Sequence, residues 1–350
     1  TLSEFHSGYR VYSVAALRRI PFELNTNVFH FDTEIIVQLV IAGMRIREVS
    51  IPTYYGDEIC HVDGLRYAWD VVIATTKARL QELSLFYDRK YDCAPAGAGN
   101  AQYTPKLDFD SPHSAVANLI RPGDRVLDLG CAGGYLSTEL TRRGAAVVAV
   151  DMFPLAQGAR VARYIQHDLN LPLPLDASEF DYVLALDVIE HLRSPENFVE
   201  QLRAALSRNP KARVIASTGN VGFVIPRLML LLGQFNYGKR GILDLTHTRL
   251  FTTRSFKQLF AQSGFDILVF RGLPAPFPQA FGTGRFSSFL MTVNQLLIRI
   301  SRSLFAYQIL LIARPRPTLA LLLQDAVDSS AARSSQMAVE QGQTLPRASP

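Results

Sequence analysis

Three aspartates spaced along the middle of the chain have the chemistry to bind a nucleoside. Asp128, Asp151 and Asp168 each stand at or near the end of a short apolar run that is expected to form a strand. A carboxylate 21 residues after Gly130, the position of Asp151, can accept both ribose hydroxyl protons. Asp168 can accept from an adenine amino group, and Asp128 could meet a ligand ammonium directly or through water. These residue types predict a nucleoside site at the ends of neighbouring strands.

A glycine-rich turn, GCAGG from Gly130 to Gly134, follows the first of these strands. Residues without a Cβ let the backbone approach a ligand and adopt positive φ. A dinucleotide site would read GxGxxG and rest a pyrophosphate on the helix N-terminus. The spacing here differs from that pattern, so a nicotinamide-dependent enzyme stays an alternative that the turn disfavours.

The elements that must position these residues alternate along the second part of the chain. Strands are expected at 126–129, 145–150, 162–166, 180–186, 213–216, 265–270 and 307–313, and helices at 113–120, 135–143, 195–207 and 254–262. This alternation predicts an α/β fold: a Rossmann-like, mostly parallel seven-stranded sheet with helices on both faces. Inserts at 221–249 and 277–304 follow strand ends, where such folds build substrate pockets.

Over roughly residues 110–315, the chain resembles the class-I S-adenosylmethionine-dependent methyltransferases. The features that carry this resemblance are, in order, the turn, Asp151, Asp168 and the later segment DVIEHL. Their first motif reads D/E-x-G-x-G-x-G, and this chain departs from it at the middle glycine position. The resemblance implies S-adenosyl-L-methionine as the cofactor. It also implies a role for each matching residue. Gly130, Ala132 and Gly134 would face the methionine part and the ribose, and Asp151 would bind the ribose hydroxyls. His167, Asp168 and Leu169 would surround the adenine, and the segment from Asp187 to His191 would lie beside the sulfonium and the acceptor.

An oxygen acceptor would also need a base, and an imidazole can accept a proton at neutral pH. His247 is the first candidate for a catalytic base and His191 the second. A structural role is open for each: His247 as a hydrogen-bonded loop residue, and Glu190 with His191 as capping and surface residues. Arg249 could neutralise a phosphate or carboxylate on the substrate, or pair with Asp244.

Residues 1–92 carry a second resemblance. They resemble the C-terminal part of a family-2 glycosyltransferase of the dolichol-phosphate-mannose-synthase type. The matching segments are, in order, SGYRVYS, FHFDTE, an expected strand at 45–51 and IPTYYGDEICHVDG. The resemblance implies that Arg10 helps to hold a substrate phosphate. The family's nucleotide-sugar strands and acidic metal-binding motif lie upstream of this part, so residues 1–92 are not expected to transfer sugar alone. The alternative is that Arg10, Asp32 and Glu34 only hold the segment together.

We therefore expect four regions. Residues 1–92 would be a small α/β remnant of a glycosyltransferase, 93–110 a linker, 111–315 the methyltransferase domain and 316–350 a disordered tail. The chain opens in mid-pattern with Thr1, which suggests a piece of a longer protein. His113, in the helix after the linker, is expected on the surface.

A long helix expected at 64–86 carries a broad apolar face that includes Leu65, Trp69 and Val72. This face could lie on a membrane surface, contact a partner or pack on its own domain. The nearby Arg66, Lys77 and Arg79 are too few to favour the membrane.

Composition excludes several classes of function. A net charge of +5 without a block of basic residues argues against nucleic-acid binding. The three cysteines form no CxxC pair, so no disulfide framework, zinc site or other metal site is predicted. The sequence shows no signal peptide and no apolar run of about 18–20 residues. We expect a cytoplasmic protein, with peripheral contact at the inner face of the membrane possible and the oligomeric state open.

Together these patterns predict methyl transfer from S-adenosylmethionine to a small-molecule acceptor, a glycan or a lipid-linked sugar. The apolar stretch 224–232 would suit a lipid-like acceptor, but a buried helix explains it equally well. Two alternatives stay open. One is polyprenyl-phosphate sugar transfer by a longer parent protein, and the other is a non-catalytic S-adenosylmethionine-binding module.

Overall fold

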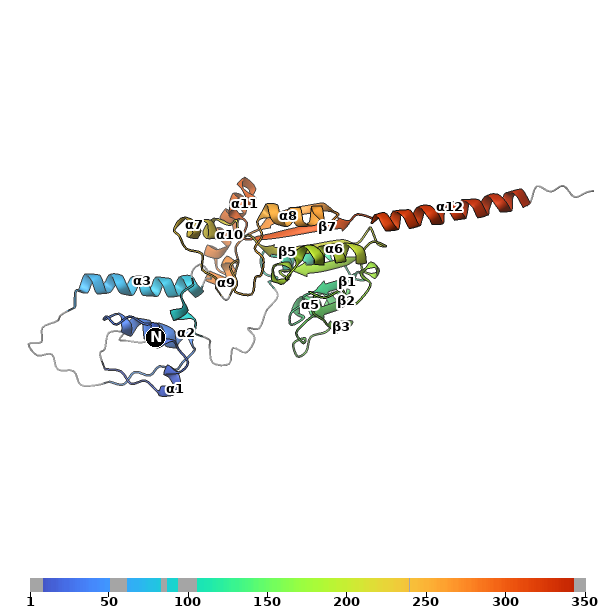
Figure 1. The fold of residues 1–350 in the computed structure, drawn as a ribbon. Helices are drawn as coiled ribbons and strands as arrows, with labels where there is room; N and C mark the ends of the chain where they lie inside the picture. The colour runs from blue at the N-terminus through green and yellow to red at the C-terminus, as the bar shows by residue number, and fades with distance from the viewer. Residues whose placement is uncertain (1–8, 51–61, 83–86, 94–105, 239, 343–350) are drawn as a thin grey trace, which may run out of the picture. The chain divides into compact units, whose positions relative to one another are not determined.

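The computed structural model describes residues 9–50, 62–82, 87–93, 106–238 and 240–342. The chain divides into two units, which are described separately below (Figure 1). The N-terminal unit comprises Thr1–Gln102 with Ile225–Thr246, and the sheet unit comprises Tyr103–Val224 with His247–Pro350.

The sheet unit is built on a seven-stranded sheet with the order β3-β2-β1-β4-β5-β7-β6. Its strands are β1 (Arg125–Leu129), β2 (Ala146–Asp151), β3 (Arg163–Gln166), β4 (Tyr182–Leu186), β5 (Arg213–Gly219), β6 (Phe265–Leu273) and β7 (Gln308–Pro315). β7 runs antiparallel to its neighbours β5 and β6, and the other pairs are parallel. The predicted seven-stranded, mostly parallel sheet is confirmed.

Helices cover both faces of this sheet. They are α4 (Pro112–Leu119), α5 (Tyr135–Arg142), α6 (Pro195–Ala205), α8 (Thr253–Gln262), α9 (Phe277–Phe281), α10 (Arg285–Ile300) and α11 (Arg302–Phe305). Successive residues of β1 point to opposite faces: Val126 packs in one core with α4 and α5, whereas Leu127 packs in the other with α6 and α8. The near-continuous apolar runs of the central strands are therefore buried on both sides.

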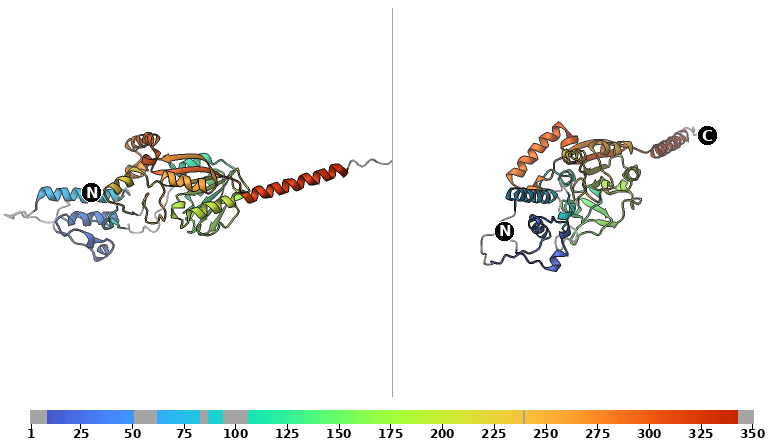
Figure 2. Two further views of the ribbon diagram at one scale, coloured as in Figure 1. Left: turned by 45° about the horizontal axis from the view of Figure 1, so that its top comes forward. Right: turned by 60° about the vertical axis from the view of Figure 1, so that its left-hand side comes forward.

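The region after β7 differs from the expectation. Helix α12 (Leu319–Gly342) forms where the sequence predicted a disordered tail (Figure 2). The Ser, Ala and Gln content that suggested disorder is compatible with a helix, because alanine has the highest helix propensity and no proline interrupts the stretch. The amide of Leu321 donates to Thr318 Oγ1, so Thr318 contributes to the start of the helix.

The regular elements in the described part of the N-terminal unit are helices. They form α1 (Val14–Leu17), η1 (Phe22–Leu24), α2 (Phe31–Ile41), α3 (Gly64–Glu82) and η2 (Arg89–Tyr91), and most of α7 (Val224–Leu231) belongs to the same unit. The strand expected at 45–51 does not form over residues 45–50, and Ile51 lies outside the described residues. A strand needs a neighbour for its backbone groups, and the described part of this unit offers none.

Helix α3 packs through a different face from the one that its sequence suggested. Ala74 and Ala78 are buried, whereas Leu65 and Trp69 are 87% and 66% exposed. Small residues let α3 lie close to α2, and the larger apolar residues are left on the opposite side. Of the three possibilities for the broad apolar face, packing on its own unit is therefore wrong.

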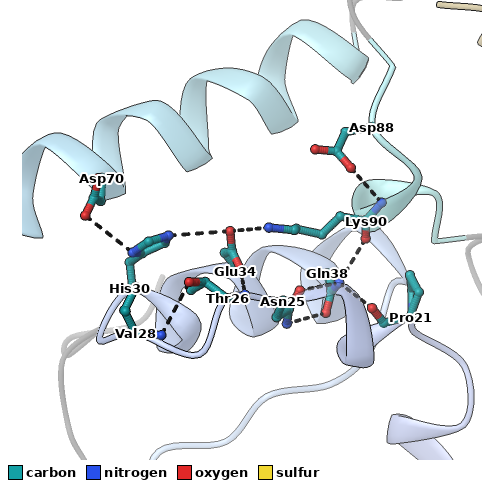
Figure 3. Close-up of polar contacts among 10 residues, drawn as sticks. All are labelled: Pro21, Asn25, Thr26, Val28, His30, Glu34, Gln38, Asp70, Asp88 and Lys90. Atoms are coloured by element: carbon teal, nitrogen blue, oxygen red, sulfur yellow. Dashed lines mark hydrogen bonds and ion pairs between the residues drawn. The ribbon is translucent and has the colours of Figure 1, made fainter.

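A polar network holds α2 to the segment around η2 (Figure 3). Glu34 is 3% exposed and accepts from Lys90 Nζ at 2.6 Å and from the Thr26 amide at 2.7 Å. Gln38 exchanges hydrogen bonds with Asn25 and donates to the carbonyl of Lys90 at 2.9 Å. These contacts fix the turn of chain between residues 21 and 30 against α2.

No described helix is both long and apolar enough to cross a membrane.

Candidate active site

The turn after β1 requires unusual backbone geometry. Gly130, Ala132 and Gly134 all have positive φ, of 74°, 49° and 75°. A Cβ at Gly130 would stand 2.3 Å from Val188 Cγ2, so the turn leaves no space for a side chain there. The left-handed region is unfavourable for a residue with a Cβ, so Ala132 adopts it at a cost of about 1 kcal/mol.

Asp151, at the end of β2, stabilises this turn. Its Oδ2 accepts from the Ala132 amide at 2.7 Å, and its Oδ1 accepts from the Phe153 amide at 2.9 Å. The side chain is 8% exposed. Each carboxylate oxygen has a second lone pair, so Asp151 can bind the turn and still accept from a ligand hydroxyl.

The segment from His167 to Leu169 lies at the next strand end. The His167 amide donates to the carbonyl of Asp151 at 2.8 Å, which ties the segment to β2. Asp168 Oδ1 accepts from the backbone and side-chain nitrogens of Asn170, and these hydrogen bonds lower its pKa. The side chain of Leu169 is buried in the core below. Asp168 therefore stands two residues after Gln166, the register partner of Asp151 in the neighbouring strand.

Asp128 is 4% exposed, and Ser137 donates to its Oδ2 at 2.5 Å. Burial raises the pKa of Asp128 to about 6. This pair links β1 to the first turns of α5, below the glycine turn. A contact between Asp128 and a ligand ammonium stays a prediction.

Asp187, directly after β4, is the other non-glycine residue with positive φ, at 54°, among those that the structure describes. Ser217 Oγ donates to its Oδ1 at 2.7 Å, and Gln308 Nε2 donates to its Oδ2 at 2.8 Å. Asp187 therefore joins the ends of β4, β5 and β7. Sequence reasoning missed Ser217 and Gln308, although each stands at the end of its strand that faces this edge.

His113 was expected on the surface, and this is wrong: it is 9% exposed. Burial lowers its pKa to about 4, against the opposing effect of the Asp187 carboxylate. The Lys106 amide donates to its Nδ1 at 3.1 Å. His113 precedes the buried Val116 and Ala117 by three and four residues, so helical spacing could have identified it as buried.

Glu190 is also buried, at 2% exposure, rather than a surface residue. Burial, followed by the charge of Asp187, raises its pKa to about 8. Its Oε2 has no hydrogen-bond partner among the described residues. Its carbonyl accepts from the amides of Thr248 and Arg249 at 2.9 and 3.1 Å, which anchors the later segment to η4 (Ile189–His191).

This anchoring brings the two candidate bases together. The rings of His191 and His247 meet edge to face, with centroids 4.8 Å apart. His191 is exposed and His247 is half-buried. Residues 56 positions apart thus lie side by side, close to the end of β4.

The two predicted substrate-binding arginines have protein partners. Arg249 Nη2 donates to Glu196 at 2.9 Å, a partner that the sequence did not suggest. In the N-terminal unit, Arg10 donates to the Asp32 carbonyl at 3.1 Å and approaches Asp32 Oδ2 at 3.7 Å. The Arg10 geometry favours the structural alternative.

The residues at this edge fit an adenosine-containing cofactor. Ribose hydroxyls and an adenine amino group are donors, and Asp151 and Asp168 present carboxylate acceptors at adjacent strand ends. Asp187 and the two histidines lie near the end of β4, which is separated from β2 by β1 in the sheet. No group of His, Cys, Asp and Glu residues able to hold a metal ion occurs in the described ranges.

Known proteins are similar to part of this chain. Residues 101–269 match the family model described as Methyltransferase domain. Ubiquinone biosynthesis O-methyltransferase of Hahella chejuensis is 32% identical over 140 residues, covering 33% of this chain and 54% of the relative. The enzyme of the same name from Azoarcus sp. is 30% identical over 156 residues, covering 42% and 64%. The chain thus spans between about half and two thirds of the length of these relatives.

Solved structures are similar at lower identity. A Burkholderia thailandensis 1,6-didemethyltoxoflavin-N1-methyltransferase with bound S-adenosylhomocysteine is 20% identical, covers 58% of this chain and 76% of its own, and has a TM-score of 0.38. The family model covers the glycine turn, Asp151, Asp168 and the segment from Asp187 to His191. Residues 101–269 are therefore similar to methyltransferase domains, and this similarity supports S-adenosylmethionine as the cofactor.

Proposed function

We propose that this chain transfers the methyl group of S-adenosylmethionine to a hydroxyl oxygen of an acceptor. The observation that carries the proposal is the single edge of the sheet at which two carboxylates and two histidines gather. The names of the relatives, which are O-methyltransferases, support oxygen as the acceptor atom.

The bound cofactor supplies an activated methyl group on a sulfonium, so the protein mainly has to align the acceptor. Asp151 accepts from the ribose hydroxyls while it holds the Ala132 amide, and Asp168 accepts from the adenine amino group. Asp187 is fixed by Ser217 and Gln308, so it keeps its position when an acceptor enters.

The remaining requirement is a group that takes the hydroxyl proton as the new carbon–oxygen bond forms. We assign this role to His247. His191 packs against the His247 ring and limits its movement. The anchoring of residues 248 and 249 on the carbonyl of Glu190 keeps both rings at the same strand end.

Two acceptor classes deserve testing. The glycosyltransferase resemblance of residues 1–92 supports a glycan or lipid-linked sugar, and a polyprenyl-phosphate sugar transferase as the longer parent protein. The relatives' role in ubiquinone biosynthesis supports a lipid-borne ring hydroxyl instead. Methyl-labelled S-adenosylmethionine, incubated with the full chain and each class in turn, distinguishes them by which acceptor becomes labelled.

The base assignment is tested with His247→Ala. We expect kcat to fall by about 10²–10⁴, with the affinity for S-adenosylhomocysteine unchanged, because proton transfer is lost and the cofactor contacts remain. Leu245→Ala, in the same loop, is the matched control and should keep its activity. Full activity of His247→Ala would remove it as the base. Cofactor binding without transfer to either acceptor class would favour the non-catalytic module, and no cofactor binding would reject both functions.

A further inference from the structure

Helix α10 lies in the insert between β6 and β7 and is firmly held on one side. Ser287, Met291, Asn294 and Ile298 are buried. Asn294 Oδ1 accepts from the Ala275 amide and its Nδ2 donates to the Phe305 carbonyl, both at 2.9 Å. These contacts determine which side of α10 faces away from the sheet.

The outward side is apolar. Phe286, Phe289, Leu296 and Ile300 are 60%, 63%, 53% and 79% exposed, and the half-buried Val293 lies between them. These five residues, here called the α10 face, follow one another at intervals of three and four residues and so form one stripe. The ring of Phe281 extends the stripe, since it meets Phe286 edge to face at 5.6 Å. An exposed apolar stripe beside a buried one indicates a binding surface.

The charges around the α10 face indicate which kind of partner it binds. Residues 267–324 contain six arginines and neither aspartate nor glutamate, and three of these arginines, Arg271, Arg314 and Arg316, pair with Asp110 or Asp266 outside this stretch. Arg285 and Arg299 stand at the two ends of α10, are exposed, and have no ion-pair partner among the described residues. An apolar stripe of Phe, Leu and Ile with basic ends and no acid is complementary to an anionic lipid surface.

A second copy of the chain fits this face poorly. Two α10 helices pairing antiparallel would bring Arg285 of one copy near Arg299 of the other, with no acid on either helix to separate the charges. The 16 residues of α10 extend about 24 Å, which suits a helix lying flat in the headgroup region rather than a spanning one.

We propose that the α10 face docks the protein on an anionic lipid bilayer. The insert leaves the sheet at Leu273, the end of β6, and returns at Gln308, the start of β7. Gln308 itself donates to Asp187, so the insert that carries the α10 face joins the sheet at the candidate active edge. The docking does not depend on the proposed methyl transfer, because it is measured without cofactor or acceptor.

Flotation of the full chain with vesicles tests the proposal. We expect binding to vesicles of phosphatidylcholine with phosphatidylglycerol and much weaker binding to phosphatidylcholine alone. Phe286→Ser with Phe289→Ser should lower the partition coefficient about tenfold or more, since two exposed rings no longer enter the interface. Leu65→Ser with Trp69→Ser on α3 is the matched control, two exposed apolar residues on another helix, and should bind like the parent.

A second variant addresses charge alone. Arg285→Gln with Arg299→Gln should weaken binding to the anionic vesicles and flatten its dependence on salt, because fewer charges are screened. Loss of binding in the α3 variant but not in the α10 variant would overturn the proposal. So would an absence of vesicle binding by the parent chain, or a dimer in sedimentation that the α10 substitutions dissociate without changing vesicle binding.

Discussion

Ala132 is the residue at which this turn departs from the glycine pattern that its sequence resembles, and Asp151 explains how it is tolerated. The Asp151 carboxylate binds the Ala132 amide at 2.7 Å and thereby stabilises a positive φ that alanine otherwise avoids. The same carboxylate is the predicted ribose ligand. A single side chain therefore shapes the turn and is also the predicted ribose ligand.

Replacing Ala132 with glycine should relieve this cost. We expect Ala132→Gly to raise the free energy of unfolding by about 1 kcal/mol, measured by chemical denaturation, because glycine adopts positive φ without strain. Ala204→Gly, on the exposed side of α6, is the control and should lower it by about 0.5–1 kcal/mol. Lower stability of Ala132→Gly would mean that the methyl group makes contacts worth more than the strain.

Glu190 makes stability depend on pH. Its folded-state pKa of about 8 lies above the usual value near 4.5, so the unfolded chain loses this proton first as the pH rises. The stability that it contributes is complete below about pH 4.5 and is lost as the pH rises toward 8.

Glu190→Gln, which resembles the protonated acid, removes this dependence. We expect its thermal midpoint to equal that of the parent chain near pH 4.5 and to exceed it increasingly up to pH 8. At pH 8 the difference in unfolding free energy should be on the order of 2–4 kcal/mol. A constant difference across the pH range would show that Glu190 does not titrate in this window.

At the scale of elements, the turn after β1 is set by the close approach of η4. Val188 fills the space beside Gly130 from the segment that follows β4. The glycine is therefore required by packing as well as by its positive φ.

Gly130→Ala should destabilise the chain by about 2–4 kcal/mol and abolish binding of S-adenosylhomocysteine, because the added methyl meets a branched side chain at 2.3 Å. Gly158→Ala is the control: φ there is +86°, but nothing lies within 4 Å of the added atom. It should cost only about 1 kcal/mol and leave binding intact. Equal effects of the two substitutions, in denaturation and titration calorimetry, would assign the loss to φ alone.

Sequence patterns predicted the elements of the sheet unit well, and their failures have physical causes. The strand expected at 45–51 was read from its local pattern, but a strand also depends on a neighbour that the pattern cannot supply. Helix α12 was missed because polar composition was weighed above helix propensity. The packing face of α3 was misread because the small Ala74 and Ala78, and not the large apolar residues, pack against its unit.

At the scale of the whole molecule, the N-terminal unit has a core of its own. Ile20, Ile35 and Leu39 form it together with Cys93, and the ion pair of Glu34 and Lys90 lies beside them. The buried carboxylate depends on its partner, because an unpaired buried charge is unfavourable.

Two units predict two calorimetric transitions. S-adenosylhomocysteine at 100 times its Kd should stabilise only the sheet unit, by about 2.7 kcal/mol. Lys90→Met should lower only the other transition, by about 3 kcal/mol, since the buried Glu34 loses its lysine and keeps only the more distant His30, at 3.8 Å. Arg79→Met, which breaks an exposed pair with Glu82, is the control and should change little. One cooperative transition that both changes move would contradict this independence.

The sequence by itself determined the order of strands and helices, the glycine turn and the acids at successive strand ends, because these follow from local periodicity and from the direction of parallel strands. Tertiary structure decided the rest. It buried His113 and Glu190, joined Asp187 to Ser217 and Gln308, and placed His191 against His247. Contacts between residues far apart in the chain depend on how elements pack, and no local pattern records which distant side chain fills a given space.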